Sequence, residues 1–414
     1  MISSLMKKLL TFVMAGGKGE RLHPLTKDRA KPAVPFGGIY RIIDFTLSNC
    51  INSGIRRIHI LTQYKSMSLA RHIRMGWNVL NSEVGEYVDV VPAQQRIDEH
   101  WYQGTADSIY QNMYSIRAEE PDQVIVLAGD HIYKMNYARM LETHREAKAD
   151  VTIGVVPSPV EEAPTLGVIE VDKDNNVTGF TEKPESEPKT VPDDPAHVFG
   201  SMGIYIFDRK ALEEELEEDA CKESQHDFGR NVIPQMIQRG NRRVIAYQFI
   251  DLNNKEALYW RDVGSLDAYY EANMDLVQVN PHFNLYDRDW PIRTYQLQYP
   301  PAKFVFAQTF GGRRGTALDS LVADGCIISG GMAQRSILAP NVRINSYADV
   351  EDSLLFDGVD VGRHAKIRGA ILDKAVRVMP GAQIGFNAEL DRKRFTVTPK
   401  GIVVVEKGAV VEAT

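Results

Sequence analysis

A glycine-rich turn near the start of the chain carries residue types that bind phosphate. Gly16, Gly17 and Gly19 follow the first apolar run, and they lack the Cβ atoms that would keep backbone N–H groups away from an anion. Two cations, Arg21 and Lys31, come next and could face the same charge. The spacing matches neither the Walker pattern nor the dinucleotide-binding pattern of glycines. The glycines alone therefore leave two interpretations open, a phosphate-binding loop and a plain strand-to-loop turn.

Two carboxylates could hold a metal ion beside this loop. Asp130 follows an apolar run and Gly129, and Asp262 lies in the segment Tyr259–Ser265. Mg²⁺ prefers one or two carboxylates together with ligand phosphates, so a second carboxylate would position a phosphate-bound ion more firmly. Gly129–Asp130 is also a common turn sequence, and the aromatic pair before Asp262 would equally suit a core. The two aspartates are candidate Mg²⁺ ligands on these grounds.

Two further segments carry side chains suited to a sugar phosphate and a base. Lys183 could bind a phosphate as a point charge, and Glu182 could accept hydrogen bonds from sugar hydroxyls. In Trp101–Asp107, Gly104 leaves space for a flat ring, and the neighbouring aromatic side chains could stack on that ring. Each segment also has a purely structural interpretation. The first could be an exposed Glu–Lys pair, and the second a helix N-terminus capped by Thr105.

The elements that must position these residues alternate between strands and helices up to about residue 280. Short apolar runs separated by helical stretches are typical of βαβ units, so we predict a doubly wound α/β domain with a mostly parallel sheet. Ligands of such sheets bind at the carboxyl ends of the strands, where Gly16, Gln63 and Asp130 all fall. The predicted strands are 9–14, 57–62, 123–128 and 151–156, and the predicted helices are 66–74 and 137–148.

The character of the sequence changes after residue 280. Residues 281–301 contain four prolines and are predicted to be a linker. Beyond the linker, aliphatic residues recur every six positions, which is the signature of a parallel β-helix and disfavours the alternative of a β-sandwich. Exposed coils of a solenoid often contact other subunits, so we also expect an oligomer. The hexad residues, whose phase slips twice, are Leu338, Ile344, Val350, Leu355, Val361, Ile367, Leu372, Val378 and Ile384.

Composition and charge exclude several classes of protein. The chain has 414 residues, enough for two or three domains, and 43% of them are hydrophobic. A net charge of −7 argues against non-specific nucleic-acid binding, which needs a basic surface. No apolar run is long enough to span a bilayer, so we expect no transmembrane helix. The three cysteines lack metal-binding spacing and predict thiols in a reducing cytoplasm.

The chain resembles the sugar-1-phosphate nucleotidyltransferases, and within them the ADP-glucose pyrophosphorylase branch of bacterial glycogen synthesis. The resemblance covers nearly all of the chain and implies a nucleotidyltransferase catalytic domain at 1–280, a linker at 281–301 and a C-terminal left-handed parallel β-helix domain at 302–414. The glycine loop and Gly129–Asp130 are shared by the whole superfamily. The segments that look specific to the branch are Arg41–Phe45, Ser48–Gly54 and Tyr259–Gly264, and further matches are Lys31–Gly38, Trp101–Asp107 and Gly129–Tyr133.

The resemblance implies an activity and a mechanism. The enzyme would transfer the adenylyl group of ATP to α-D-glucose 1-phosphate, giving ADP-glucose and pyrophosphate. A phosphate monoester is already nucleophilic at neutral pH, so the reaction needs positioning and charge stabilisation rather than a general base. Two alternatives stay open. One is a nucleotidyltransferase with another base or sugar specificity, and the other is a catalytically silent regulatory subunit.

The same resemblance implies a role for each candidate residue. Arg21, Lys31, Asp130 and Lys183 would be catalytic, with Arg21 stabilising the departing pyrophosphate, and Asp130 and Asp262 would bind Mg²⁺. Glu20 replaces the threonine that is usual in the family, and we expect its side chain to point away from the phosphates. The nucleotide would contact Ala15, Gly16, Gly17, Gly19, Gln63, Gly104 and Thr105, and glucose 1-phosphate would contact Tyr102, Gly167, Glu182, Lys183 and Ser201.

Members of the family are commonly homotetramers regulated by anionic metabolites. The candidate effector-binding residues are Arg29, Arg41, Arg392 and Arg394, although a basic turn in solvent explains them equally well. Asp28 occupies a position that is often lysine in members activated by a sugar bisphosphate, which argues against that activator here. We thus expect a cytoplasmic homotetramer that binds ATP, glucose 1-phosphate and an anionic effector, and that binds neither nucleic acid nor membrane.

Overall fold

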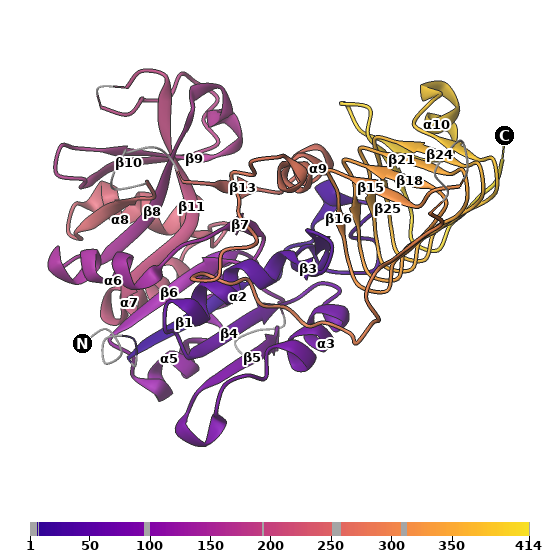
Figure 1. Ribbon diagram of the computed structural model, residues 1–414. Helices are drawn as coiled ribbons and strands as arrows, with labels where there is room; N and C mark the ends of the chain where they lie inside the picture. Colours follow the sequence, from indigo (N-terminus) through magenta and orange to yellow (C-terminus); the bar gives the residue numbers. More distant parts are fainter. Residues whose placement is uncertain are drawn as a thin grey trace.

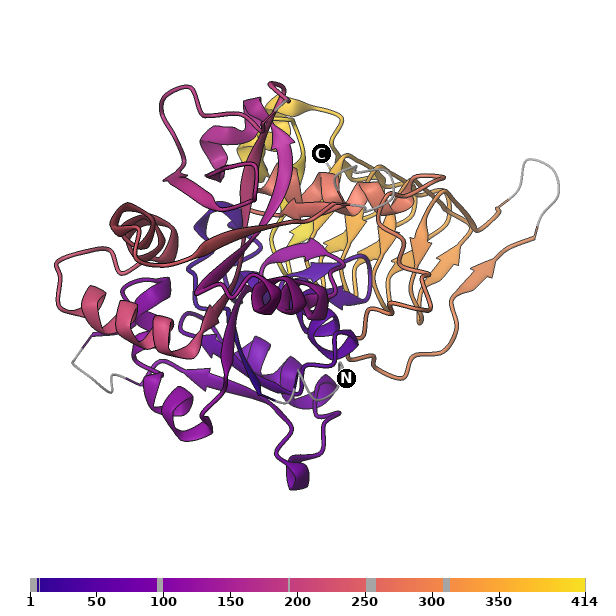
Figure 2. The same cartoon turned by 90° about the vertical axis from the view of Figure 1, so that its left-hand side faces the viewer.

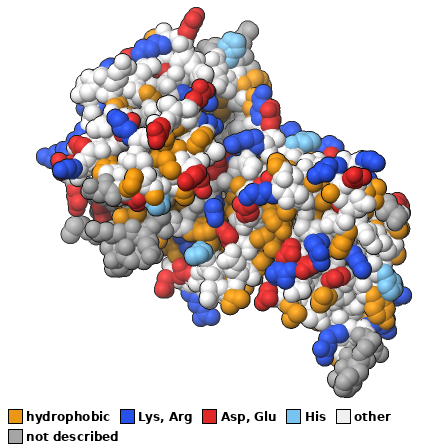
Figure 3. Space-filling view, turned by 90° about the horizontal axis from the view of Figure 1, so that it is seen from above, with side chains coloured by type: hydrophobic (Ala, Val, Ile, Leu, Met, Phe, Trp, Pro, Cys, Tyr) orange, Lys and Arg blue, Asp and Glu red, His pale blue; other side chains and the backbone are white. Residues whose placement is uncertain are grey.

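The computed structural model describes residues 6, 8–94, 100–192, 194–250, 258–307 and 313–413. A sheet flanked by helices forms the N-terminal lobe, and a solenoid of stacked coils forms the C-terminal lobe beside it (Figures 1 and 2). In the space-filling view, basic and acidic side chains are interspersed over both lobes (Figure 3). Among the described residues, none of the helices is both long enough and apolar enough to cross a bilayer.

A nine-stranded sheet forms the frame of the N-terminal lobe. Its first half is parallel, with the strand order β6–β1–β4–β5. These strands are short apolar runs linked by helices, and the strands predicted at 9–14, 57–62 and 123–128 are confirmed. The bounds are β1 Leu9–Met14, β4 Arg57–Thr62, β5 Tyr87–Pro92 and β6 Gln123–Ala128.

The second half of the sheet is antiparallel, so the sheet is mixed rather than mostly parallel. β11 pairs antiparallel with β6, β8 and β9, β9 pairs antiparallel with β10, and β12 alone returns parallel to β8. Parallel pairs need a crossover that is usually an α-helix, and the described chain between β8 and β11 contains none. The bounds are β8 Val151–Pro159, β9 Gly167–Val171, β10 Val177–Glu182, β11 His197–Asp208 and β12 Val244–Gln248.

Helices cover both faces of the sheet, so the domain is doubly wound as predicted. Leu9 and Val13 of β1 face one apolar cluster, which includes α2, α3 and α6, and Leu10 and Phe12 face a second, which includes α4, α5, α7 and α8. This alternation follows from the two-residue period of a strand. The bounds are α2 Ile42–Asn52, α3 Met67–Gly76, α4 Thr105–Tyr110, α5 Met113–Glu119, α6 Tyr137–Glu146, α7 Arg209–Ala220 and α8 Ile233–Arg239.

The C-terminal lobe is the parallel β-helix that the hexad spacing predicts. Successive coils add strands to three sheets, which are parallel apart from one short antiparallel strand near the C-terminus, and the hexad residues form the buried interior. Leu338 pairs with Leu355, and Leu355 with Leu372, so a coil contains seventeen residues. The two phase slips, after Val350 and after Ile367, therefore arise because the third side of each of these coils is one residue shorter than the other two sides.

The strands of the three sheets stack in coil order. In the first sheet they are β14 Lys303–Val305, β17 Ile327–Ser329, β20 Arg343–Ile344, β23 Asp360–Val361, β26 Arg377–Val378 and β30 Val410–Val411. In the second they are β15 Thr316–Leu318, β18 Met332–Gln334, β21 Asp349–Glu351, β24 Lys366–Arg368 and β27 Gln383–Ile384. In the third they are β16 Leu321–Val322, β19 Ile337–Leu338, β22 Leu354–Leu355, β25 Ala370–Leu372, β29 Val403–Val405 and β28 Thr396–Val397, and α10 is Ala388–Arg394.

One apolar cluster joins the two lobes. Phe36, Phe45 and Tyr269 of the N-terminal lobe share this cluster with Leu354 and Phe356 of the β-helix. Tyr269 comes from α9 (Leu266–Met274). The segment 278–302 contains neither helix nor strand and connects α9 and the short 3₁₀ helix after it to the first coil. A shared core of this kind fixes the two lobes relative to each other.

Candidate functional site

The glycine-rich loop leaves the carboxyl end of β1 and leads into the 3₁₀ helix Glu20–Leu22. Gly19 has a φ of 66°, a left-handed backbone conformation that glycine adopts without strain. A Cβ atom at this position would lie 3.1 Å from side-chain atoms of both Lys31 and Thr26. The fold of the loop therefore requires glycine at position 19.

Gly16 and Gly17 are not required by the fold in this way. A Cβ at Gly17 would meet no atom of the described residues within 4 Å, and one at Gly16 would have its nearest described neighbour at an ordinary contact distance of 3.4 Å. Gly17 instead borders two adjoining pockets of about 450 and 570 Å³, and Gly16 borders the larger one. Backbone that is open toward a cavity favours the phosphate-binding interpretation over the plain turn.

The smaller of these pockets, which we call the loop pocket, gathers the charged residues of the loop. Arg21 and Lys31 border it together with Asp130, so both predicted cations reach the same cavity as a predicted metal ligand. Glu20 is exposed and also borders this pocket. The other predicted residues in its wall are Ala15, Gly17 and Gly19, and Gly264 lies there as well.

Asp130 and Asp262 meet at the ammonium group of Lys31. Asp130 lies in the turn between β6 and β7 (His131–Tyr133), and Asp262 ends β13 (Trp260–Asp262). Because β13 pairs antiparallel with β7, Asp262 lies opposite His131. Lys31 Nζ donates to Asp130 Oδ2 at 2.8 Å and to Asp262 Oδ1 at 3.2 Å. Three segments distant in sequence thus converge on one charged group.

Lys31 and Asp130 hold each other in the ionised state. Burial alone would lower the pKa of Lys31, but the two carboxylates outweigh burial and raise it. Burial would likewise raise the pKa of Asp130, but the positive charge of Lys31 holds that pKa well below its usual range. The charge of Arg21, which borders the same pocket, also acts on Asp130 in this direction.

The side chains around Asp130 fit a divalent metal ion. Ligand atoms of Asp130, His131 and Asp262 all lie within 4.8 Å of one another. Lys31 occupies only one oxygen of each aspartate, so Asp130 Oδ1 and Asp262 Oδ2 are available to a cation. His131 was missed as a site residue by the sequence reasoning, although it directly follows Asp130 in the motif. Its Nε2 lies 3.6 Å from Asp130 Oδ1.

The larger pocket brings together residues predicted for the base and for the sugar, and we call it the base–sugar pocket. It shares Gly17 and Asp130 with the loop pocket, so the two cavities form one continuous site. The predicted residues in its wall are Gly16, Gln63, Tyr102, Gly104, Thr105 and Glu182. Sequence reasoning missed Tyr205, Asp227, Phe228 and Gly229, which also form this wall, because no recognisable motif marks them.

Gly104 and Thr105 support the wall of this pocket in a way the sequence did not reveal. A Cβ at Gly104 would lie 2.1 Å from His226 O. The absence of a side chain at Gly104 therefore lets the backbone turn at His226 approach, in addition to any space that it leaves for a ligand ring. Thr105 Oγ1 donates to Asp227 Oδ2 at 2.9 Å and makes no capping bond to α4. Of the purely structural alternative, the helix N-terminus is confirmed, because α4 begins at Thr105, but the cap by Thr105 is wrong, because His226 O accepts from Ala106 N at 2.8 Å there.

Gly167, Lys183 and Ser201, also predicted for glucose 1-phosphate, are described residues that do not line the base–sugar pocket. A Cβ at Gly167 would be 2.8 Å from Glu182 Oε2, so the absence of a side chain at Gly167 leaves space for that carboxylate. Ser201 Oγ lies 3.4 Å from the hydroxyl of Tyr205, and the hydroxyl of Tyr102 accepts from an asparagine amide. Burial raises the pKa of Glu182 above its usual value.

Lys183 has an unusual backbone conformation at the edge of this group. Its φ is 50°, in the left-handed region that a lysine rarely adopts, and its N–H donates to Leu166 O at 2.9 Å. Its ammonium group is 3.8 Å from Glu182 Oε1 and the side chain is 44% exposed. Non-glycine residues in this conformation persist where surrounding contacts enforce them and are concentrated at functional sites.

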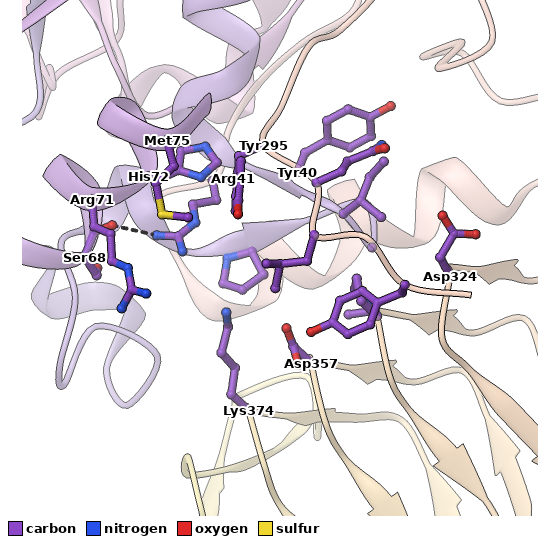
Figure 4. Close-up of a pocket in the computed structure, with 18 residues that line it drawn as sticks. Tyr40, Arg41, Ser68, Arg71, His72, Met75, Tyr295, Asp324, Asp357 and Lys374 are labelled. Atoms are coloured by element: carbon purple, nitrogen blue, oxygen red, sulfur yellow. Dashed lines mark hydrogen bonds between the residues drawn. The ribbon is translucent and has the colours of Figure 1, made fainter. Parts of the chain in front are cut away.

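A third pocket, of about 320 Å³, lies where the N-terminal lobe meets the β-helix, and we call it the interlobe pocket. Arg41 and Arg71 reach it from β3 (Tyr40–Arg41) and α3, and Lys374 and Asp357 reach it from the coils (Figure 4). Burial, and then the neighbouring charge of Arg41, lower the pKa of Lys374. Crowded cations of this kind favour an anionic ligand.

The structure does not bring the four candidate effector arginines together. Arg41 borders the interlobe pocket, whereas Arg29 is buried and forms a bidentate ion pair with Asp373 at 2.8 and 2.9 Å. Arg392 and Arg394 lie on α10, which is well separated from β3 (Figure 1). Charge runs in a sequence indicate exposed turns, but they do not show which turns meet across an interface. Arg71 and Lys374 are the cations that sequence reasoning missed.

The chain is similar to known proteins over nearly all of its length. Residues 10–279 match the family model described as nucleotidyl transferase, and residues 300–405 match one described as GlmU-like, C-terminal hexapeptide. A glucose-1-phosphate adenylyltransferase of Koribacter versatilis is 54% identical over 97% of this chain and 96% of its own length. Proteins with the same name from Rhodopirellula baltica and Methylococcus capsulatus are 55% and 52% identical, each over 98% of this chain and over 92% and 94% of their own lengths.

Proposed function

The chain belongs to the nucleotidyl transferase family and, within it, to the glucose-1-phosphate adenylyltransferases, and from this membership we propose that it transfers the adenylyl group of ATP to α-D-glucose 1-phosphate. The products are ADP-glucose and pyrophosphate, and the reaction serves bacterial glycogen synthesis. One observation above all supports the proposal. The open glycine loop, the cations Arg21 and Lys31, and the carboxylate Asp130 border a single cavity.

The reaction is a direct in-line displacement at phosphorus. A phosphate oxygen of glucose 1-phosphate forms a bond to the α-phosphorus of ATP, and the bond from that phosphorus to the bridging oxygen of the β-phosphate breaks. The nucleophile is already ionised at neutral pH, so the protein supplies orientation and positive charge and no general base. Pyrophosphate leaves with the electron pair of the broken bond.

Each part of the site has a task in this displacement. The backbone at Gly16 and Gly17 receives the triphosphate, and Arg21 stabilises the charge on the departing pyrophosphate. Lys31 neutralises charge near the α-phosphate while it holds the two aspartates together. Mg²⁺ bound by Asp130 and Asp262 would supply additional positive charge to the phosphates. Gln63, Gly104 and Glu182 border the base–sugar pocket, which would hold the adenine and the sugar, and Lys183, beside Glu182, would bind the sugar phosphate.

The direct test is release of pyrophosphate by the purified chain from ATP, Mg²⁺ and glucose 1-phosphate. We expect release with ATP, and much slower release when GTP, UTP or dTTP replaces it. A preference for another nucleotide would make the chain a nucleotidyltransferase of different specificity. No release with any nucleotide would favour the silent regulatory subunit, although the presence of Arg21, Lys31, Asp130 and Lys183 argues against that alternative.

Lys183→Ala is expected to weaken the use of glucose 1-phosphate selectively. The ammonium group lies beside Glu182 and away from the loop pocket, so its loss removes charge from the sugar-phosphate side of the site. We expect the KM for glucose 1-phosphate to rise by at least tenfold, as loss of a charge-assisted contact of about 1.4 kcal/mol or more implies, with little change in the KM for ATP. Steady-state kinetics with each substrate varied in turn would measure both constants. Equal increases in the two KM values would contradict this placement.

We also propose that the interlobe pocket binds an anionic effector through Arg41, Arg71 and Lys374. The pocket lies between the lobes and combines a guanidinium of β3 with an ammonium of the β-helix. A bound anion would contact both lobes, and it would relieve the repulsion between these cations. Activity measured with a panel of sugar bisphosphates, AMP and inorganic phosphate would identify the effector.

Lys374→Gln is expected to weaken that effector by at least tenfold, because one of three facing cations is lost. In the unsubstituted protein, the lowered pKa of Lys374 means that its charge is present below that pKa and is lost as the pH rises through it. Effector affinity should therefore fall with rising pH, and this fall should be smaller in Lys374→Gln. The half-saturating effector concentration, measured across pH, checks both points. Arg392→Gln, on α10, is the matched control, and an equal loss in the two variants would contradict the assignment.

The remaining expectations concern organisation in the cell. We propose that the chain acts as a cytoplasmic homotetramer, with catalysis in residues 1–280, a linker at 281–301, and effector binding and assembly served by the β-helix at 302–414. Light scattering coupled to size-exclusion chromatography would measure the assembly directly. A monomer at micromolar concentration would contradict the proposed tetramer.

A further inference from the structure

α2 combines deep burial with an unusual number of polar side chains. Its residues 42–50 are all buried, and four of them, Asp44, Thr46, Ser48 and Asn49, are polar and 0% exposed. Buried polar groups are costly unless they form hydrogen bonds. The partners of these four side chains therefore show what the helix holds in place.

Two of the four hold the segment that carries Asp130. Thr46 Oγ1 donates to Ala128 O at 3.0 Å, and Asn49 Nδ2 donates to Tyr133 O at 3.0 Å. Asn49 Oδ1 accepts from Met135 N at 3.2 Å and, outside this segment, from Trp290 Nε1 at 2.8 Å. These backbone groups lie on both sides of Asp130, two residues before it and three and five residues after it.

This segment depends on side chains because it departs from the main sheet. β6 ends at Ala128, and among the described strands β7 pairs with β13 alone, in a separate two-stranded sheet. A two-stranded unit is weakly stable without further packing. α2 supplies the contacts that the nine-stranded sheet does not provide at this point.

The other end of α2 is itself firmly fixed. Asp44 accepts from His72 Nε2 at 2.6 Å, Trp77 Nε1 at 2.8 Å and Thr294 Oγ1 at 2.7 Å, and also from the N–H of Arg41 at 2.8 Å. The helix is thereby tied to α3, to the strand before it and to the segment that leads to the β-helix. A helix held in this way is a rigid reference for the groups that it contacts.

We propose that Thr46 and Asn49 are positioning residues for the carboxylates of the site. They hold the segment 128–135 so that Asp130 lies within reach of Lys31 and Asp262, and neither side chain touches a substrate. The inference rests on the proposed function, since it holds that side chains of α2 position Asp130 for binding a metal ion. Partners that orient metal ligands typically change metal affinity or activity by 10- to 100-fold when they are removed.

The test is a comparison of Thr46→Val with Thr46→Ser and Thr152→Val. Valine removes the donor at position 46 while keeping the shape, and serine keeps the donor. Thr152 lies in β8, away from the site, and its hydroxyl is equally buried but contacts His144. Thr152→Val removes that hydroxyl and so serves as the control. Asn49→Ser tests the second contact, because it removes the amide that reaches Tyr133 O. Binding of Mn²⁺ in the presence of ATP, followed by electron paramagnetic resonance, gives a readout that does not depend on turnover.

We expect Thr46→Val and Asn49→Ser to weaken Mn²⁺ binding and to lower kcat, each by 10- to 100-fold, with the KM for glucose 1-phosphate changed less than threefold. Thr46→Ser should stay within about threefold of the unsubstituted protein, and Thr152→Val should shift Tm without changing Mn²⁺ affinity. Unchanged Mn²⁺ affinity in both Thr46→Val and Asn49→Ser, or an equal loss in Thr152→Val, would overturn the inference. An unsubstituted protein that binds Mn²⁺ but releases no pyrophosphate would instead overturn the proposed function, and the Mn²⁺ comparison would still decide the role of α2.

Discussion

Asp130→Asn is expected to lower kcat by about 10²- to 10³-fold, equivalent to about 3–4 kcal/mol of barrier, as loss of one preorganised electrostatic group does in other enzymes. The substitution keeps the shape of the side chain but removes its charge. Lys31 would then face a single carboxylate, and a metal ion would lose a ligand oxygen. The turnover number at saturating ATP and glucose 1-phosphate measures the effect.

Asp122→Asn is the matched control for this prediction. Asp122 directly precedes β6, whereas Asp130 follows the same strand at its other end, and Asp122 is half exposed and paired with Lys8. An exposed pair of this kind contributes little, so the control should retain full turnover. If Asp130→Asn turned over at a rate close to that of the unsubstituted protein, the assignment of Asp130 to the metal would be wrong.

The second large effect concerns stability rather than catalysis. Arg29→Met is expected to reduce the free energy of unfolding by about 3–5 kcal/mol, because it leaves the carboxylate of Asp373 buried without its partner. The side chains of Arg29 and Asp373 are only 8% and 3% exposed, and the pair links the glycine-loop segment to the β-helix. Urea denaturation followed by circular dichroism measures the loss.

Two comparisons separate the buried pair from a general loss of interlobe contacts. Lys27→Met removes an exposed pair with Glu406 across the same interface, and we expect it to leave the free energy of unfolding almost unchanged, because water and salt screen such a pair. The double variant Arg29→Met/Asp373→Leu removes both buried charges, so it should recover most of the stability lost by the single variant. A double variant that is less stable than Arg29→Met would show that the ion pair itself, and not the unpaired charge, governs the effect.

Prediction from the sequence was most successful for strands and coils whose burial follows a local pattern of apolar residues. Runs such as 57–62 and 123–128 formed strands at the predicted residues, and the hexads from Leu338 onward formed the interior of a β-helix. A continuous apolar run reflects burial on both faces of a sheet, and a period of six reflects the sides of a β-helical coil, so both patterns appear in the sequence without knowledge of distant partners. The antiparallel half of the sheet was not predicted, because strand direction depends on connections and pairings rather than on apolar content.

The sequence predicted which residues belong to the candidate site better than it predicted which residues those side chains contact. Gly19 is required by the backbone of its own loop, whereas Gly104 is required by the turn at His226, more than a hundred residues away. His131 was adjacent to a recognised motif and could have been included. Asp227 carries no local signal, because its place in the base–sugar pocket comes from its bond to Thr105.

The sequence by itself thus determined which residues could do chemistry and which segments would form strands, helices and coils. The tertiary structure decided which of them act together. Lys31 reaches Asp130 and Asp262 across 99 and 231 residues, and Arg29 reaches Asp373 across 344. Local spacing indicates burial along one element, but ion pairs over such separations form only when the chain folds, within the N-terminal lobe for Lys31 and between the two lobes for Arg29. For this reason Arg29, predicted as an effector ligand, lies in an interlobe ion pair, and Lys374 is the cation that the β-helix presents to the interlobe pocket.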